Sequence, residues 1–405
     1  MKLAALLLAV LALLASPAVA RKAPREGYRT SGQCDGFPRV SLTTPPKLCV
    51  GLVAAKLGFP RGLALIGSDL YIADLASRTP GRGRILRLAQ FGRGAPQVVL
   101  SGLNQPNGLA ADDKGRLYVG EVGRVFRFDP RAADPRATIL TVITGLPSEG
   151  RHNLTSLVLA PDGGLIVNVG SFSDNCETAT GGMPNPAARC PELQQRPPRG
   201  ALLRIAPGTS LPVAAANAEV FASGIRNAMA LAFLSDGTLI AASNGRDNID
   251  SADPKLSDDA LPHDLLLKVD KGANYGWPYC FDAGRPSPEF PRFNCSTVRA
   301  PIMLLAPHAA PLGMIRYSGT RLPGLTGKLL LAYHGYRARG HRIVAIAVGP
   351  GGVPSGTEND IVSGWTGVAG LRPQGMPVAL LELPDGSVLI AEDQNRCLLR
   401  LSTTG

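Results

Sequence analysis

The sequence predicts an all-β protein, a six-bladed β-propeller, and three observations support this prediction. Helical periodicity is almost absent, and 47 Gly and 35 Pro residues divide short apolar runs. A unit consisting of a turn, an apolar strand, a Gly-containing turn and a second apolar strand recurs six times. Most units are followed by another strand with basic residues. Repeats of two to four short strands are typical of propellers, in which radial closure removes exposed sheet edges.

The six units follow one another without a linker, which disfavours two separate domains. In each unit the first strand is expected to line the centre of the propeller and the second to pair with it. The spacing is irregular, unlike the near-constant period of a WD40-type array. The third strands carry an Arg-x-x-Arg or similar pattern at residues 84–87, 124–127 and 397–400. The units cover residues 60–73, 106–119, 156–167, 230–241, 312–331 and 377–390.

Two long insertions and the N-terminal region complete the expected architecture. Residues 173–198 and 249–261 are predicted to form loops over one face. Residues 39–55 should supply an outer strand to the last blade and so close the ring. The propeller is expected to cover residues 39–405, after an N-terminal extension at residues 21–38.

The first twenty residues have the features of a secretory signal peptide. A basic residue precedes an apolar run at residues 3–14, and the small-residue pattern Ala18-Val19-Ala20 follows. We expect residues 1–20 to be removed and the protein to be periplasmic or secreted. The run is too short to span a membrane, and no later segment has eighteen uninterrupted apolar residues.

Seven cysteines fit an oxidising compartment, where disulfides persist. We predict three local disulfides and one buried thiol at Cys397, although six cysteines allow many connectivities. The sequence has no Cys-x-x-Cys-His haem motif and no Cys-x-x-Cys pair for zinc. The predicted pairs are Cys34/Cys49, Cys176/Cys190 and Cys280/Cys295.

The chain is basic, with 42 Lys and Arg residues against 31 Asp and Glu residues, a net charge of +11. The basic residues are scattered and form no dense cluster interleaved with aromatic residues, so a nucleic-acid partner is not expected. The surplus arginines should keep the surface solvated, and a few should meet an anionic cofactor or an anionic membrane face.

The segment 223–278 has the densest set of functional side chains. It reads Ser-Gly-Ile-Arg-Asn at 223–227, Ser-Asn-Gly-Arg-Asp at 243–247, Pro-His-Asp at 262–264 and Asn-Tyr-Gly-Trp-Pro at 274–278. A guanidinium, a carboxamide and acidic oxygens beside glycine turns can hold an anionic cofactor next to a hard cation.

This order, with the flanking segments 152–163 and 307–313, resembles the soluble quinoprotein sugar dehydrogenases and most closely their sorbosone dehydrogenase-like branch. The resemblance covers most of the chain after about Gly58. It implies a propeller that uses pyrroloquinoline quinone (PQQ) and calcium.

The resemblance assigns catalysis to His152 and Arg226. A neutral imidazole at His152 would act as general base and take the proton from a sugar hydroxyl while hydride leaves the same carbon. Arg226, with Asn227 beside it, would contact the quinone oxygen and stabilise the negative charge that grows there. The structural alternatives are an ordinary loop histidine and an arginine that joins two blades.

The resemblance places calcium on two main-chain carbonyls, those of Gly245 and Arg246, and on the side chain of Asp264. Aspartate is a hard-oxygen ligand, but it is one methylene shorter than the more usual glutamate. His263 stands where an acidic residue is common, which lowers the local negative charge. The remaining acidic residues are expected to form a solvated loop, namely Asp247, Asp250, Asp258 and Asp259.

Two further histidines, His308 and His334, resemble histidines of the sorbosone-like branch. We expect them to line the channel and bind the cofactor, with ordinary hydrogen-bonded loop histidines as the alternative. Tyr275 and Trp277 are expected to be structural, because they flank Gly276 in a tight turn.

One position departs from the family pattern. Met376 stands where the family more often has arginine, and methionine cannot neutralise the carboxylates of PQQ. Arg372, or Arg337 and Arg339 on the preceding blade, would then supply the charge.

The leading hypothesis is a PQQ- and calcium-dependent oxidoreductase that oxidises a sugar or a related alcohol or aldehyde hydrate. Its partners would be a small sugar or polyol and an external electron acceptor, since no haem domain is present. A calcium-dependent lactonase is one alternative, but it would need a cluster of Glu, Asp and Asn side chains that is not evident. A propeller that has lost the cofactor and acts as a binding module is the other.

Overall fold

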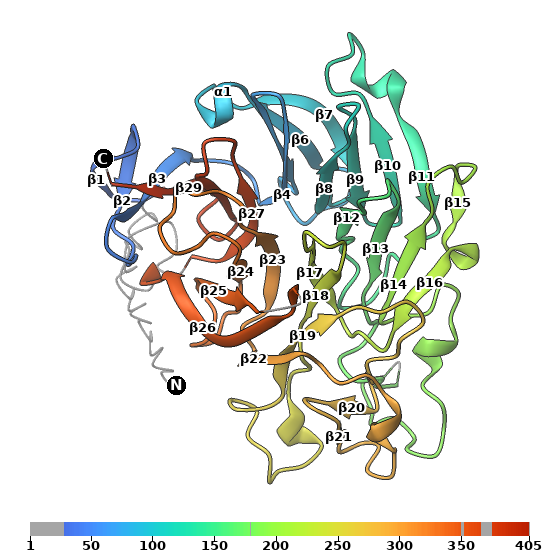
Figure 1. Cartoon of the computed structure of the whole chain (residues 1–405). Coiled ribbons are helices and arrows are strands. Elements are labelled where there is room, and N and C mark those ends of the chain that lie inside the picture. The colour runs from blue at the N-terminus through green and yellow to red at the C-terminus, as the bar shows by residue number, and fades with distance from the viewer. Residues whose placement is uncertain (1–27, 179, 350–351, 366–374, 405) are drawn as a thin grey trace, which may run out of the picture.

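The computed structural model describes residues 28–178, 180–349, 352–365 and 375–404. Six sheets are arranged radially around a central channel (Figure 1), which confirms the predicted all-β, six-bladed β-propeller. Within these residues the only α-helix is the short α1 (Ala89–Gly92), and no helix is long and apolar enough to cross a membrane. The predicted signal peptide lies outside the described residues.

The first three blades are built in chain order, each from the innermost strand outward through antiparallel pairs. Blade 1 contains β4 (Pro60–Ile66), β5 (Asp69–Asp74), β6 (Gly83–Leu88) and β7 (Gln97–Leu103). Blade 2 contains β8 (Gly108–Ala111), β9 (Leu117–Glu121), β10 (Arg124–Phe128) and β11 (Leu140–Thr144), with β15 (Val213–Ala214) parallel at its outer edge. Blade 3 contains β12 (Leu157–Leu159), β13 (Leu165–Val169), β14 (Ala201–Ile205) and β16 (Glu219–Ser223).

The next two blades follow the same pattern, and a small hairpin of β20 (Cys280–Phe281) and β21 (Arg285–Pro286) interrupts the fourth. Blade 4 contains β17 (Ala228–Phe233), β18 (Leu239–Ser243), β19 (His263–Lys268) and β22 (Met303–Pro307). Blade 5 contains β23 (Pro311–Arg316), β24 (Leu329–Tyr333), β25 (Arg342–Val348) and β26 (Pro354–Val362).

The sixth blade combines both ends of the chain and so closes the ring. Antiparallel pairing joins β3 (Leu48–Ala54) to the C-terminal β29 (Cys397–Thr403), which confirms the predicted outer strand. Two more strands extend this sheet outward, so it begins at Thr30, within the segment treated as an extension in the sequence. The sheet contains β27 (Pro377–Glu382), β28 (Val388–Glu392), β29, β3, β2 (Phe37–Val40) and β1 (Thr30–Cys34).

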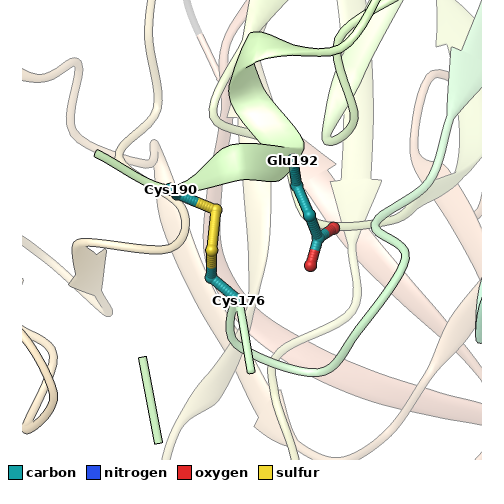
Figure 2. Close-up of side chains that lie close together, drawn as sticks. All are labelled: Cys176, Cys190 and Glu192. Atoms are coloured by element: carbon teal, nitrogen blue, oxygen red, sulfur yellow. A yellow bond between two sulfur atoms is a disulfide. The ribbon is translucent and has the colours of Figure 1, made fainter. Parts of the chain in front are cut away.

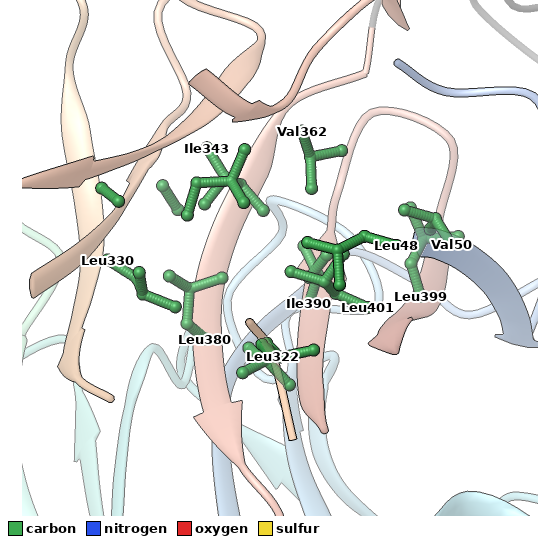
Figure 3. Close-up of a cluster of buried hydrophobic side chains, with 14 of the residues drawn as sticks. Leu48, Val50, Leu322, Leu330, Ile343, Val362, Leu380, Ile390, Leu399 and Leu401 are labelled. Carbon is green, nitrogen blue, oxygen red and sulfur yellow. The ribbon is translucent and has the colours of Figure 1, made fainter. Parts of the chain in front are cut away.

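Apolar side chains fill the spaces between adjacent blades. Because successive strand residues point to opposite faces, each blade contributes to the core on either side of it. The second strands of blades 2 to 6 are buried along their whole length, which is why they read as continuous apolar runs. Figure 3 shows the core shared by blades 5 and 6, with Leu48, Val50, Leu322, Leu330, Ile343, Val362, Leu380, Ile390, Leu399 and Leu401 labelled.

A repeated acidic residue explains the basic pattern of the third strands. Asp74, Glu121 and Glu392 end the second strands of blades 1, 2 and 6, and each accepts main-chain N–H groups from the loop that enters the innermost strand. Arg84, the second residue of its third strand, lies 2.9 Å from Asp74, and Arg124 lies 2.5 Å from Glu121. The basic residue therefore neutralises a buried carboxylate.

Blade 6 lacks that arginine, and Cys397 takes its place. The side chain of Glu392 instead accepts a hydrogen bond from Tyr28 at 2.8 Å, and burial raises the pKa of Glu392. Cys397 is the buried free thiol that the sequence predicts, and all three predicted disulfides are present.

Glycines allow the innermost strands of neighbouring blades to touch. The N–H of Gly62 donates to the carbonyl of Asn107 at 2.9 Å, and the N–H of Gly108 donates to that of Thr155 at 2.9 Å. A Cβ atom at Gly62 would lie 2.5 Å from the Asn107 carbonyl oxygen. The ring closes tightly because these positions carry no side chain.

We therefore expect Gly62→Ala to lower the free energy of unfolding by about 1–3 kcal/mol, the usual cost of overpacking. Gly182→Ala is the matched control, because Gly182 is exposed, has an ordinary φ and faces only a threonine hydroxyl at 3.1 Å. Its effect should stay within about 0.5 kcal/mol. Denaturant unfolding measures both, and equal values would contradict this account of the ring.

Candidate functional site

All the described site residues that the sequence predicts lie at one end of the channel or in the loops around it. In each blade the first and second strands are antiparallel, so the start of the first strand lies beside the end of the second. The loop that enters the first strand and the loop that leaves the second therefore lie at the same end of the channel. The central cavity below these loops is about 180 Å³, and the innermost strands of all six blades line it. The sequence therefore brings loops from every blade to one opening.

His152 lies against the loop that follows β13. Its Nδ1 atom is 2.8 Å from the hydroxyl of Ser171 and 3.3 Å from the carbonyl oxygen of the same residue. The N–H of Ser171 donates to the carbonyl of Arg226 at 2.9 Å. Ser171 thus joins the two residues predicted to be catalytic. Burial, and then the charge of Arg226, lowers the pKa of His152 well below 6.5.

Arg226 is buried and fully engaged. Its guanidinium forms an ion pair with Asp174, and the side chains of both residues are about nineteen-twentieths buried, at 5% and 6% exposure. The same guanidinium donates to the carbonyls of Gly245 at 2.6 Å and Asn244 at 3.3 Å. It therefore reaches one of the two carbonyls that the sequence predicts to hold calcium.

Asp264 lies directly beyond this carbonyl. Its carboxylate accepts hydrogen bonds from the N–H of Gly245 and the N–H of Ala310, both at 2.6 Å. Burial raises the pKa of Asp264 to about 6, against the effect of these two donors. A buried carboxylate whose charge is disfavoured is well suited to bind a cation.

His308 and Arg337 share two acidic partners. Nδ1 of His308 is 3.4 Å from Asp247, and Arg337 pairs with Asp258. The contact with His308 lowers the pKa of Asp247 to about 2 against the effect of burial. Burial works to lower the pKa of His308, but the contact with Asp247 outweighs it and the pKa rises above 6.5. The prediction of a solvated acidic loop is therefore wrong for these two carboxylates.

The other two acids of that loop behave as expected. Asp250 and Asp259 are exposed. Asp247 and Asp258 differ because basic side chains from blade 5 and from the loop before it reach them. Sequence proximity grouped the four, but only the tertiary fold distinguishes them.

His334 belongs to a network on the far side of the opening. Its Nε2 atom is 3.2 Å from Asp393, which also pairs with the buried Arg61 at 2.6 Å. Arg61 donates a hydrogen bond to the side chain of Asn107 at 3.0 Å, and Asn107 donates to the carbonyl of Thr155 at 3.2 Å. Burial works to raise the pKa of Asp393, but His334 and Arg61 lower it to about 2.

Together with the main chain between His152 and Thr155, these contacts form a closed circuit around the channel opening, which we call the polar ring. It passes through all six blades: Thr155 closes it three residues after His152, and the N–H of His334 links it to the carbonyl of Ala310 at 3.1 Å. The members of the polar ring are Arg61, Asn107, His152, Thr155, Ser171, Arg226, Gly245, Asp264, Ala310, His334 and Asp393.

Sequence reasoning missed several members of this site. Arg61 and Asn107 occupy the same position in the first two repeat units, before the glycine, and that equivalence was a signal for both. Asp174 lies within the predicted lid-like insertion at 173–198, and Ser171 lies two residues before it. No local pattern distinguished them from other loop residues.

The remaining predicted residues divide into three groups. The carboxamide oxygens of Asn227 and of its neighbour Asn244 are buried without a hydrogen-bond partner in the described residues. The side chain of Arg246 turns to Glu289, so only its main chain remains for a ligand. Arg372 lies outside the described residues.

The position that departs from the family pattern has a structural partner. The N–H of Met376 donates to Glu392 at 2.7 Å. Of the expected substitutes for its charge, Arg339 is exposed and Arg337 is bound to Asp258. Tyr275 and Trp277 are buried, and Trp277 donates to the carbonyl of Asp174 at 3.3 Å, which agrees with a structural role.

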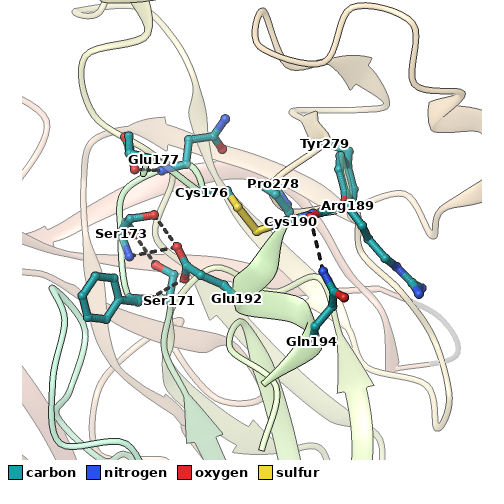
Figure 4. The surroundings of a disulfide bond; sticks show 12 residues. Ser171, Ser173, Cys176, Glu177, Arg189, Cys190, Glu192, Gln194, Pro278 and Tyr279 are labelled. Atoms are coloured by element: carbon teal, nitrogen blue, oxygen red, sulfur yellow. Dashed lines mark hydrogen bonds between the residues drawn. A yellow bond between two sulfur atoms is a disulfide. The ribbon is translucent and has the colours of Figure 1, made fainter. Parts of the chain in front are cut away.

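The insertion at 173–198 is held by a disulfide rather than by a metal. Cys176, Cys190 and Glu192 lie together, but the two sulfurs are bonded to each other (Figure 2). Glu192 accepts the N–H of Phe172 at 2.6 Å and the N–H and hydroxyl of Ser173 (Figure 4). This fixes the segment that carries Ser171 beside His152.

Comparison with known proteins identifies the family. The family model described as Glucose / Sorbosone dehydrogenase matches residues 124–337, more than half of the chain. A search of the curated proteins finds no match.

Solved structures share the fold at low identity. A carbohydrate-active enzyme of family AA12 from Trichoderma reesei has 17% identity and a TM-score of 0.73, covering 93% of this chain and 100% of that one. The PQQ domain of pyranose dehydrogenase from Coprinopsis cinerea, in its holo form, has 18% identity and a TM-score of 0.69, covering 91% and 99%. The PQQ-bound aldose sugar dehydrogenase from Streptomyces coelicolor has 20% identity and a TM-score of 0.60, covering 89% and 100%. The chain belongs to the glucose/sorbosone dehydrogenase family.

Proposed function

We propose that this protein is an exported quinoprotein that oxidises a sugar or a related alcohol or aldehyde hydrate with PQQ and calcium. The observation that carries the proposal is the polar ring, which joins His152, Arg226 and Asp264 at one end of the channel. The family and three disulfides support it further, since disulfides persist in oxidising compartments.

The residues at the opening fit a flat, anionic, oxygen-rich cofactor. Asn227 and Asn244 each have a buried carboxamide oxygen without a partner, and buried polar atoms are normally paired. Arg61 places a guanidinium at the opening, although Asp393 is its ion-pair partner, as Asp258 is that of Arg337. Arg226, Asn227, His308, His334 and Arg337 would hold the cofactor, and Arg372 is proposed as a further contact. When bound, PQQ would supply an acceptor for two electrons and a proton equivalent.

The protein residues would perform the proton transfer. His152 is neutral at pH 7, because its pKa is lowered, and would take the proton of the substrate hydroxyl. Arg226 would stabilise the negative charge that develops on the quinone oxygen. Its ion pair with Asp174 fixes the position of the guanidinium. Burial of this pair excludes water and strengthens its electrostatic effect.

Calcium would be held by the carbonyls of Gly245 and Arg246 and by Asp264. The carbonyl of Gly245 also accepts a hydrogen bond from Arg226. A bound calcium ion would therefore share this oxygen with the guanidinium, which links the metal to the catalytic arginine. The carboxylate of Asp264 offsets the added positive charge.

A lactonase is less well supported. Three carboxylates near the opening, those of Asp174, Asp247 and Asp393, are paired with cationic side chains. A hydrolase of this type needs carboxylates that are free to bind metal and activate water.

The direct test is reconstitution with PQQ and calcium. We expect cofactor absorbance and reduction of an artificial dye with at least one aldose. His152→Ala should reduce turnover by at least about 100-fold, the value of a general base, while absorbance remains. His263→Gln is the matched control, because His263 pairs with Asp282 outside the polar ring.

Three results would contradict this proposal. Full turnover by His152→Ala would show that His152 is not the base. Calcium-dependent lactone hydrolysis without quinone would support the lactonase, and binding of neither cofactor would favour a propeller without catalysis.

Calcium should raise the melting temperature of the quinone-free protein, because a ligand that binds only the folded state stabilises it. The increment should disappear in Asp264→Ala and persist in Asp250→Asn, whose side chain is exposed. The comparison uses the calcium-induced increment, since Asp264→Ala also leaves two buried N–H groups unpaired. Equal increments in both variants would place calcium elsewhere.

The pH profile of kcat/KM should show its acid limb below pH 6.5. The lowered pKa of His152 means that the imidazole stays neutral at pH 6.5 and loses its base function only at lower pH. A limb at or above pH 6.5 that disappears in His152→Ala would contradict the described environment of the imidazole.

A further inference from the structure

The hydrogen bonds around His152 determine which ring nitrogen carries the proton. Nδ1 is 3.3 Å from the main-chain carbonyl of Ser171 and 2.8 Å from its hydroxyl oxygen. A carbonyl oxygen can only accept a hydrogen bond. The first of these contacts therefore favours an N–H group at Nδ1.

The hydrogen bonds of the Ser171 hydroxyl also favour a proton on Nδ1 of His152. It donates to the carbonyl of Ser173 at 2.7 Å, and a hydroxyl has only one proton to donate. Its oxygen is then left to accept from Nδ1 of His152. Both partners of Nδ1 are thus acceptors, and in neutral imidazole the lone pair must lie on Nε2.

The other ring nitrogen is open. No hydrogen bond to Nε2 of His152 occurs among the described residues, and the side chain is half-buried rather than enclosed. The back of the residue is closed, because a Cβ at Gly170 would lie 2.5 Å from the Cβ of His152. Nε2 is therefore the ring nitrogen that is available to a substrate proton.

Ser171 also fixes where this base lies. The residue is fully buried, and its N–H donates to the carbonyl of Arg226 at 2.9 Å. Ser171 is neutral, so it stabilises the imidazolium less than a carboxylate would, although its main-chain hydrogen bond acts to raise the pKa of His152. The charged groups that act on the ring are Arg226, Arg151 and Asp247.

We infer that Ser171 is a positioning residue that holds His152 as its Nδ1–H tautomer, so that Nε2 takes the substrate proton. The inference rests on the proposed function for the role of His152. The tautomer itself is a property of the protein without quinone and can be measured independently.

The first test is a long-range ¹H–¹⁵N spectrum of the quinone-free protein at pH 8. The chain has five histidines, and His152→Asn assigns the resonance by its loss. We expect a protonated Nδ1 and an unprotonated Nε2 at His152. Ser171→Ala keeps the main-chain carbonyl that Nδ1 contacts, so the same tautomer should remain the major one there but lose population to the Nε2–H form. A protonated Nε2 in the wild type would overturn the inference, and an unchanged tautomer population in Ser171→Ala would overturn the role of the Ser171 hydroxyl.

The second test is kinetic and uses the reconstituted enzyme. Ser171→Ala should lower kcat about tenfold, near the value of one hydrogen bond, with KM unchanged. Ser171→Asp should keep the tautomer and shift the acid limb of kcat/KM to higher pH, because a carboxylate stabilises the imidazolium. Ser173→Ala, which keeps the accepting carbonyl but loses its hydroxyl bond to Glu192, is the control for loop damage.

Equal losses in Ser171→Ala and Ser173→Ala, or no pH shift in Ser171→Asp, would reduce Ser171 to a structural residue. Absence of dehydrogenase activity in the reconstituted wild type would contradict the proposed function instead. The tautomer spectrum would still stand in that case, so the two failures are distinguishable.

Discussion

The polar ring is the constraint on which the functional end of this propeller depends. Loops from all six blades converge on one opening. Ion pairs and main-chain hydrogen bonds join these loops, from Arg61 and Asp393 on one side to Arg226 and Gly245 on the other. Several of its members, such as Arg61, Arg226 and Asp264, are buried, so leaving any of these groups unpaired would be costly.

Charge compensation follows from this arrangement. Arg226, Arg61 and Arg337 each have a carboxylate partner, so the charges of these three arginines are compensated. Because these arginines already have carboxylate partners, an anionic cofactor would add net negative charge at the opening. A bound calcium ion would offset that charge. Under the proposed function, calcium and quinone would be linked through Arg226 and the carbonyl of Gly245, which accepts a hydrogen bond from it.

The fold could be predicted from the sequence because each blade repeats the same local pattern of apolar strands and glycine turns. The disulfides and the ring-closing strand followed from short spacing and from the need to cover an edge. The acidic residues were harder, because Asp247 and Asp258 meet His308 and Arg337 only after five blades have formed. The role of Ser171 could not be predicted for the same reason. It depends on three hydrogen bonds to His152 and Arg226, which lie far from Ser171 in the sequence.

The most direct test of the central claim is a crystal structure of the protein with calcium and PQQ. This account predicts the quinone across the channel opening, between His152 and Arg226, with calcium at Gly245 and Asp264. A quinone bound at the opposite end of the channel or on the outer face of a blade would contradict it. So would a polar ring that is broken in the crystal while the cofactor is bound.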